Sequence, residues 1–315
     1  MTQALSWQER IALKKETTWG TGVNPDVSFP ITDGSISFQS TASYDEGRRG
    51  TASGTFDALI DAAHSEANIE GWFYPNASSW LLYGLFGQDS ITGAGDPYTH
   101  TFQLASSVPS FTVEQDVIGG TNGAIRATGM RVGSMNFSFE ADKGALTYSA
   151  QLMGKIPSKV TAQNPAITSE NAFEGWRATL TSTGLDCKAV SGEINLTREL
   201  QIVHTGCDSQ DVSFINAGPM QAEGRFNVVF DNMAIFDLAL ANTRQALTLS
   251  FTKGSPAREI LFTLTDCFLN AQPFEFDYGG MGVQGVVGFR GIYNSTDAGV
   301  CKVAVKNSRA TAYSA

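Results

Sequence analysis

The sequence predicts a mainly β protein with two tandem antiparallel β-sandwich or barrel domains, each carrying one short helix. Period-two alternation of apolar and polar residues is the first observation behind this prediction. In "GALTYSAQLMG", residues 144–154, every second residue from Leu146 to Leu152 is apolar and those between are polar. Strands with one polar and one apolar face are typical of antiparallel sheets that pack as sandwiches or barrels.

The same alternation recurs in both halves of the chain. It appears in "MNFSFEA" (135–141), in "LTLSFT" (247–252) and in "ILFTLTD" (260–266). The chain also contains 32 glycines, many of them between these runs, where turns and bulges need them. We therefore expect short strands joined by turns throughout.

A duplication is the second observation. "EGWFYPNASSWLLYGL" (70–85) aligns with "EGRFNVVFDNMAIFDL" (223–238), so that Glu70 and Gly71 fall on Glu223 and Gly224. "SFT" then occurs at both 110–112 and 250–252, and residues 137–154 align with 274–291. Because the matches keep their order while their spacing drifts, we interpret the chain as two copies of one unit with unequal loops.

Each copy predicts one helix at the same place. Ser78 and Asp231 are favoured N-cap residues at equivalent positions. Apolar residues follow both at three- and four-residue spacing, which is typical of one buried helical stripe. Gly87 offers a stop for the first helix.

These patterns divide the chain of 315 residues into five parts. We expect an N-terminal arm (1–30), a first domain (31–155), a linker (156–175), a second domain (176–294) and a C-terminal arm (295–315). Each half is long enough to bury its own core. The linker is polar and contains two prolines.

Charge and composition exclude several classes of protein. The formal net charge is −10, and no cluster of Lys and Arg suits a general phosphate binder. No apolar run is long enough for a membrane helix, and the N-terminus has no secretory signal pattern. We therefore expect a cytoplasmic protein with reduced cysteines.

The sequence predicts no catalytic, cofactor or metal site. His64, His100 and His204 lie in no catalytic or zinc motif, and we expect them in turns or on the surface. Cys187, His204, Cys207 and Cys267 have no compact zinc spacing. "GMGVQG" (280–285) fits a dinucleotide fingerprint by letters, but a β-like run follows it, so we interpret it as a hairpin.

Several segments resemble the tail tube proteins of long-tailed bacteriophages. The family often begins with a Lys/Glu-Thr-Thr-aromatic-Gly-Thr segment, found here as "KETTWGT" (15–21). The resemblance continues through residues 69–87, 96–117 and 129–155, and the second half is similar as a diverged copy. The resemblance implies two tail-tube-like domains. Single-unit members form six-fold rings, so a two-unit chain implies rings of three copies.

The resemblance also implies a function and partners. It implies a structural virion protein, not an enzyme, whose stacked rings form the tail tube through which genomic DNA is ejected. The implied partners are further copies of the chain and the tail-tip or initiator, tape-measure and terminator proteins, with DNA passing unbound. It implies no cofactor, no membrane contact, assembly in the bacterial cytoplasm and a place in the virion tail; a tail without a contractile sheath is expected.

Candidate site residues follow from this interpretation. An acidic lumen would repel phosphate, and strand alternation nominates Glu140 and Asp277 as lumen-facing acids. For contacts between rings we nominate Trp19 and the loop "SYDEGRRG" (43–50), which carries four charged residues, namely Asp45, Glu46, Arg48 and Arg49. Alternatively, this loop is merely solvated and Trp19 packs on the sheet.

Two other functional classes stay open at this point. A tail terminator or a decoration protein would share the duplicated sandwich but would stop at one ring or bind a capsid. A carbohydrate-binding or hydrolysing double β-sandwich would be a soluble monomer that uses its aromatic residues as a platform. Self-association into tubes separates the main interpretation from both.

Overall fold

The structure is a computed structural model that describes residues 9–117, 123–167, 170–182, 189–206, 209–230, 244–271, 275–276 and 283–315. These residues form antiparallel strands, one α-helix, α1 (Ser79–Phe86), and one 3₁₀ turn, η2 (Gly175–Arg177). The predicted mainly β fold is therefore confirmed.

The strands divide between the two halves of the chain, which we call the first and second repeats. The first repeat contains β1 (Arg10–Lys15), β2 (Val27–Phe29), β3 (Asp33–Asp45), β4 (Asp57–Trp72), β5 (Gly87–Thr92), β6 (Tyr98–Leu104), β7 (Phe111–Asp116), β8 (Ala124–Glu140), β9 (Thr147–Gly154) and β10 (Ser158–Val160). The second contains β11 (Ala178–Thr181), β12 (Ala189–Val203), β13 (Phe214–Phe230), β14 (Gln245–Lys253), β15 (Arg258–Ala271), β16 (Glu275–Phe276), β17 (Val283–Gly291) and β18 (Lys302–Asn307).

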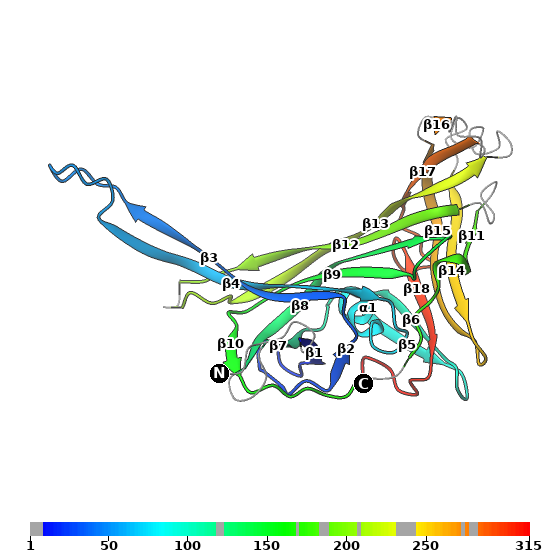
Figure 1. Ribbon diagram of the computed structural model, residues 1–315, viewed down its shortest axis with the longest axis horizontal. Helices are drawn as coiled ribbons and strands as arrows, with labels where there is room; N and C mark the ends of the chain where they lie inside the picture. Colours follow the sequence, from blue (N-terminus) through cyan, green and yellow to red (C-terminus); the bar gives the residue numbers. More distant parts are fainter. Residues whose placement is uncertain are drawn as a thin grey trace.

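One long antiparallel sheet runs through both repeats (Figure 1). Its strand order is β3-β4-β9-β8 in the first repeat, continued by β12-β13-β17-β15 in the second. The two halves join where β8 pairs with β12, from Ser134 opposite Thr197 to Glu140 opposite Ser191. We call this eight-stranded structure the long sheet.

Further strands form a second layer against one face of the long sheet. In the first repeat β2, β1, β7 and the N-terminal part of β8 pair in this order, and β8 also pairs with β10. In the second repeat β11, β14 and the N-terminal part of β15 pair in this order, and β15 also pairs with β18. The predicted arms are therefore part of the fold, since β1, β2 and β18 lie in this layer.

The strands of the long sheet correspond between the repeats, but not in the register that the sequence alignment suggested. Glu70 of β4 lies opposite Ser149, and its counterpart Glu223 of β13 lies opposite Arg290. Ser149 therefore corresponds to Arg290, whereas the alignment placed it on Val286. The connection between β15 and β17 is longer than that between β8 and β9, and such an insertion shifts an alignment drawn through it.

The two repeats share one hydrophobic core, although each half is long enough to bury a core of its own. Phe137 of β8 and Phe262 of β15 are both buried, with ring centroids 4.9 Å apart. Phe139 of β8 meets Phe251 of β14 at 5.3 Å. Because the sheet is continuous across the junction, apolar side chains from both repeats fall on the same face and pack together.

Helix α1 confirms the prediction for the first repeat. Every side chain in it is buried. Gly87 ends the helix in the left-handed conformation with φ 87°, and its N–H bonds to the Tyr83 carbonyl. Ser78 precedes the helix but makes no cap hydrogen bond, because its Oγ accepts the N–H of Tyr74 instead. The second predicted helix, after Asp231, lies outside the described residues.

A buried arginine from the second repeat satisfies carbonyl groups of the first. Arg198 of β12 is 4% exposed and donates to the carbonyls of Leu85 (3.3 Å), Ala105 (2.9 Å) and Gly218 (3.0 Å). Leu85 lies in the last turn of α1, where unpaired carbonyls and the helix dipole favour a cation. Arg198 therefore fixes the second repeat to the helix of the first.

Replacing Arg198 by Ala should lower the free energy of unfolding by about 3 kcal/mol, because one buried and two partly buried carbonyls lose a charged donor. Urea denaturation followed by circular dichroism measures the change. The matched control is Arg244→Ala, since Arg244 is 64% exposed and forms a surface ion pair with Asp266. Equal midpoints for the two variants would show that Arg198 does not join the repeats.

Candidate functional site

The face of the long sheet that points away from the core is mostly polar, with Trp72 and Phe268 as exposed apolar exceptions. Cross-strand neighbours form rows on this face, and one row contains Glu70, Ser149, Asn136, Asn195, Glu223 and Arg290. The alternate residues of the same strands, such as Ile69, Ala150 and Phe226, are buried in the core. Period-two alternation therefore creates one continuous polar surface, which we call the polar face.

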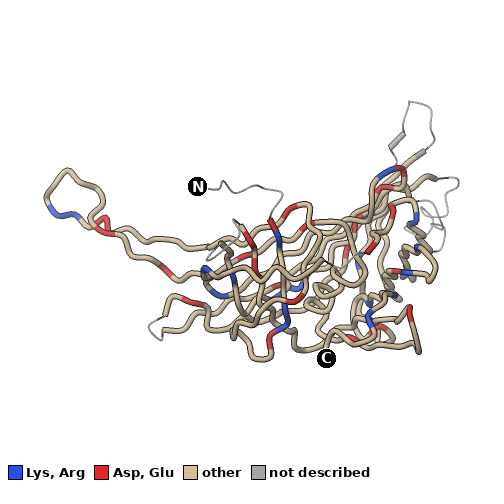
Figure 2. The backbone as a smooth tube through the Cα atoms, turned by 60° about the horizontal axis from the view of Figure 1, so that its bottom comes forward, with Lys and Arg blue, Asp and Glu red and all other residues tan. Residues whose placement is uncertain are grey.

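Acidic side chains outnumber basic ones on the described polar face. The register places on it the glutamates Glu66, Glu70, Glu140, Glu193 and Glu223 and the arginines Arg131, Arg225 and Arg290. Glu193 pairs with Arg225 at 2.9 Å, and Glu70 accepts hydrogen bonds from Asn68 (2.7 Å) and Ser149 (3.1 Å). Figure 2 shows basic positions interspersed with acidic ones and no continuous basic track over the described chain.

The structure places one of the two nominated lumen acids. Glu140 ends β8 on the polar face, and its half-exposed carboxylate lies 2.8 Å from the amino group of Lys143. Asp277 lies outside the described residues. Other acids that the sequence did not nominate, above all Glu70 and Glu193, share the same face, and strand alternation alone could have found them.

Three shallow hollows line the polar face, with volumes of about 510, 440 and 380 Å³. The largest lies between Trp72, Glu140 and Arg225, and Trp72 is 48% exposed. The side chains that line each hollow come from neighbouring strands of the sheet. Within the described residues, no group of three or more His, Cys, Asp or Glu is arranged to hold a metal.

The two end strands of the long sheet have open edges. On β3 the Gln115 side chain occupies the edge at one point, where it accepts the Ile36 N–H (2.8 Å) and donates to the Gly34 carbonyl (3.2 Å). Beyond Ile36 this edge of β3 pairs with no strand among the described residues. At the other end, residues 268–271 of β15 pair only with β17 in the described chain.

The hairpin of β3 and β4 projects far from the body as a two-stranded arm, seen at the left of Figure 1. The arm, residues 38–62, exposes four large hydrophobic side chains, namely Phe38, Tyr44, Leu59 and Ile60. All four nominated charged residues of the loop lie at its tip, where Arg49 pairs with Asp45 and stacks 4.6 Å from the Phe56 ring centroid. Exposed apolar residues on an isolated hairpin are typical of an interaction surface.

The corresponding hairpin of the second repeat packs back onto the chain. The carbonyl of Gln210, in the loop between β12 and β13, accepts the Ala63 N–H of β4 at 2.9 Å. The next residue, Asp211, bonds to the Ile156 N–H (2.8 Å) and pairs with Lys155 (3.2 Å). Only the first repeat therefore presents a free arm among the described residues.

Trp19 lies half-buried against the first repeat. Its indole N–H donates to the Gly129 carbonyl at 3.2 Å, and the Lys155 amino group lies 5.5 Å from its ring centroid. The segment is held by Glu16, a buried carboxylate that sequence analysis missed. Glu16 accepts four hydrogen bonds, from the N–H groups of Gly20 and Gly129 and the hydroxyls of Ser110 and Thr112.

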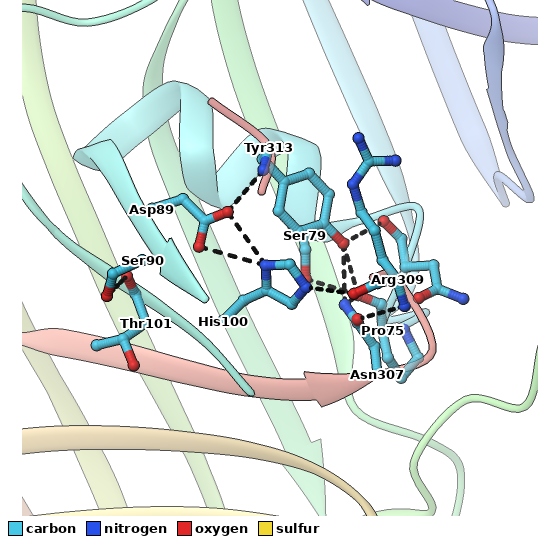
Figure 3. A network of polar contacts seen from close by, with 10 residues as sticks. Pro75, Ser79, Asp89, Ser90, His100, Thr101, Asn307, Arg309 and Tyr313 are labelled. Carbon is cyan, nitrogen blue, oxygen red and sulfur yellow. Dashed lines mark hydrogen bonds and ion pairs between the residues drawn. The ribbon is translucent and has the colours of Figure 1, made fainter. Parts of the chain in front are cut away.

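One histidine expectation was wrong. His100 of β6 is fully buried, with Nδ1 3.1 Å from Asp89 and Nε2 2.9 Å from the Arg309 carbonyl (Figure 3). The alternation of "YTHTFQL" places His100 on the same face as buried Phe102, and this signal could have found it. His64 and His204 are not buried.

The two described cysteines are buried and unpaired. Burial raises the pKa of the Cys267 and Cys301 thiols to about 12. Both therefore remain protonated near neutral pH and behave as small apolar groups. Cys187 and Cys207 lie outside the described residues.

A family model described as phage tail tube protein matches residues 6–294 of the chain. The chain belongs to this family. The match covers the first repeat and the second repeat through β17, and it confirms the resemblance seen in "KETTWGT" and the segments that follow it. No curated protein matches the chain.

Membership in this family indicates the general role of the protein. The protein is a structural component of a phage tail tube, and tail tubes belong to the virion tail. Within the described residues no helix has the length and apolar character needed to cross a membrane.

Proposed function

We propose that three copies of this tail tube protein close into a ring with pseudo-six-fold symmetry, and that the rings stack into a tube for genomic DNA. The open edges at the two ends of the long sheet are the observation that supports this most strongly. The junction of β8 with β12 inside the chain offers a template for pairing β15 of one copy with β3 of the next. Such head-to-tail contacts close a ring and leave no sheet edge exposed.

The repeated strand order supports the proposed ring. Each repeat contributes four strands in the same sequence to the long sheet, so three chains supply six equivalent sets. In this arrangement the polar face lines the lumen and the second layer faces outward. The chain then has a structural role and no catalytic one, with tail-tip or initiator, tape-measure and terminator proteins as its other partners in a tail without a contractile sheath.

Blocking the open part of the β3 edge, beyond Ile36, tests strand pairing between copies. The outward-facing N–H groups of β3 belong to even-numbered residues, as the bond from Ile36 to Gln115 shows, and Ser40 follows in the same phase. Ser40→Pro should leave the monomer folded but reduce assembly at least tenfold, because proline lacks the N–H needed for strand pairing at the open part of this edge. Negative-stain electron microscopy and light scattering measure assembly, with Ser40→Thr as the control. Normal tubes from a folded Ser40→Pro variant would contradict edge pairing.

The arm of the first repeat is proposed to contact the next ring. It exposes apolar side chains that its own chain does not cover, and its tip carries Asp45, Glu46, Arg48 and Arg49. Trp19 lies on the first repeat near Lys155 and is proposed to support the same contact. Three arms per ring would then link each ring to its neighbour.

Replacing all four charged tip residues by Ala should shorten tubes and lower their yield, while single rings still form. Tube length is measured by electron microscopy after assembly at equal protein concentration. The control replaces Asp26, an exposed residue of the second layer paired with Lys14. Unchanged length and yield in the tip variant would rule out the tip as a stacking contact.

The acidic polar face is proposed to let DNA pass without binding. Carboxylates repel phosphate, and the effect is strongest in a confined channel at low salt. Glu140 and Asp277 are the proposed lumen acids, and Glu70 and Glu193 join Glu140 on the described face.

Reversing the charge of Glu140 and Asp277 to Lys should slow or stall DNA ejection from intact particles, and added salt should partly restore it because screening weakens phosphate binding. Ejection kinetics measured with a DNA-binding dye give the rate. Asp26→Lys makes the same kind of charge change on the second layer, and particles that carry it should eject DNA normally. Wild-type kinetics in the lumen variant at low salt would contradict the proposal.

A further inference from the structure

The last strand of the chain joins the two repeats. One edge of β18 pairs with β15 of the second repeat, from Lys302 opposite Thr263 to Lys306 opposite Glu259. Its other edge pairs with β6 of the first repeat, from Val303 opposite Phe102 to Asn307 opposite Tyr98. Through β18 the second layer becomes continuous from β11 to β5, in addition to the continuity of the long sheet.

The end of β18 and the residues after it bind the first repeat in a buried pocket (Figure 3). Tyr313 is fully buried, its ring centroid lies 4.9 Å from that of Trp80 in α1, and its hydroxyl donates to the Asn76 carbonyl at 2.8 Å. Asn307 is also fully buried and donates to the Pro75 carbonyl (3.0 Å) and to the Tyr313 hydroxyl (2.9 Å). The pocket thus recognises two specific side chains of the C-terminal segment.

A buried histidine and aspartate hold the backbone of the same segment. Asp89 of β5 accepts the Tyr313 N–H at 2.6 Å and also lies 3.1 Å from Nδ1 of His100. Nε2 of His100 lies 2.9 Å from the Arg309 carbonyl. The Arg309 guanidinium covers the pocket, 4.7 Å from the Trp80 ring centroid and 4.8 Å from that of Tyr313. Polar groups buried with matched partners make an interaction specific.

The second repeat has fewer residues at the place where the first repeat forms this pocket. The pocket is built on α1 and on the β5–β6 hairpin, residues 87–104, within the connection between β4 and β7. The equivalent connection between β13 and β14 is residues 231–244, which is shorter than the β5–β6 hairpin alone. The counterpart of β18 in the first repeat is β10, which pairs with β8 only among the described strands.

We propose that residues 302–315 are a clasp that binds the first repeat of the same chain and locks both repeats into one building block. The junctions of the proposed ring then alternate, clasped within each chain and unclasped between chains. The alternation rests on the proposed ring, whereas the clasp is a property of the single chain. Rings should therefore come apart between chains.

A nicked chain tests the clasp without any assembly. A protease site inserted between Ala166 and Ile167, both exposed, allows the linker to be cut in the folded protein. The cut protein should keep the mass of one chain, 33.7 kDa before insertion, because the shared core and the clasp still hold the halves. Sedimentation in increasing urea then measures their association. Halves that separate without urea would overturn the single building block.

Clasp variants of the nicked chain isolate its contribution. Asn307→Ala with Tyr313→Ala should weaken association of the halves at least 100-fold, and Tyr313→Phe, which loses only the hydroxyl, about tenfold. Thr311→Ala changes an exposed residue of the same segment and serves as the control. If the double variant does not fold, Tyr313→Phe decides. Association equal to that of Thr311→Ala would overturn the clasp.

Tubes of nicked protein test the alternation. Tubes assembled from a mixture of isotopically heavy and light nicked chains are dissolved gradually in urea, and the released particles are weighed by native mass spectrometry. Each released particle is expected to contain an N-terminal half and a C-terminal half that are both heavy or both light. Mixed pairs or free halves would overturn the alternation. If no tubes form, the proposed function fails, while the nicked single chain still decides the clasp.

Discussion

The pairing of β8 with β12 is the interaction on which the rest of the structure depends. It turns two copies of a four-stranded sheet into one sheet, and therefore gives both copies the same polar and apolar faces. The apolar faces then share one core, in which Phe137 packs on Phe262 across the repeats. The same pairing uses up the two inner edges and leaves the outer edges, on β3 and β15, as the places where a further strand can add.

The duplicated units have diverged mainly in their connections. The first repeat keeps a free arm and the β5–β6 hairpin, whereas in the second repeat the hairpin tip at Gln210 packs back onto β4. Strands in a sheet are constrained by partners on both sides, but connections are not, so insertions and deletions gather there. As a result the two halves resemble each other in the sheet and differ in what they offer to other molecules.

The polar face combines features that suit a surface past which a polyanion moves. Its rows consist mostly of Ser, Thr, Asn, Gln and Glu side chains, and Arg225 is paired with Glu193. Uncharged polar groups keep such a surface hydrated, and unpaired carboxylates oppose close approach of phosphate. Fewer arginines offset the acidic charge in the first repeat than in the second. On the described face the first repeat contributes Arg131, whereas the second contributes Arg225 and Arg290.

The sequence by itself determined the local features. Alternation predicted which side chains of β8, β9, β14 and β15 face the core, and Gly87 predicted the end of α1, because both depend on residues close together in the chain. The family was also recognisable from short segments such as "KETTWGT". These signals were enough for the fold class and the coarse function.

Tertiary structure alone decided the features that depend on distant partners. Arg198 and Glu16 are buried polar residues whose hydrogen-bond partners lie mostly far away in sequence, so no local pattern indicates their burial. The pairing of Glu223 with Arg290 likewise contradicts the sequence alignment, since an insertion between β15 and β17 hides the true register. Side-chain direction is a local property of a strand, but register and buried polar contacts are set by which strands meet in space.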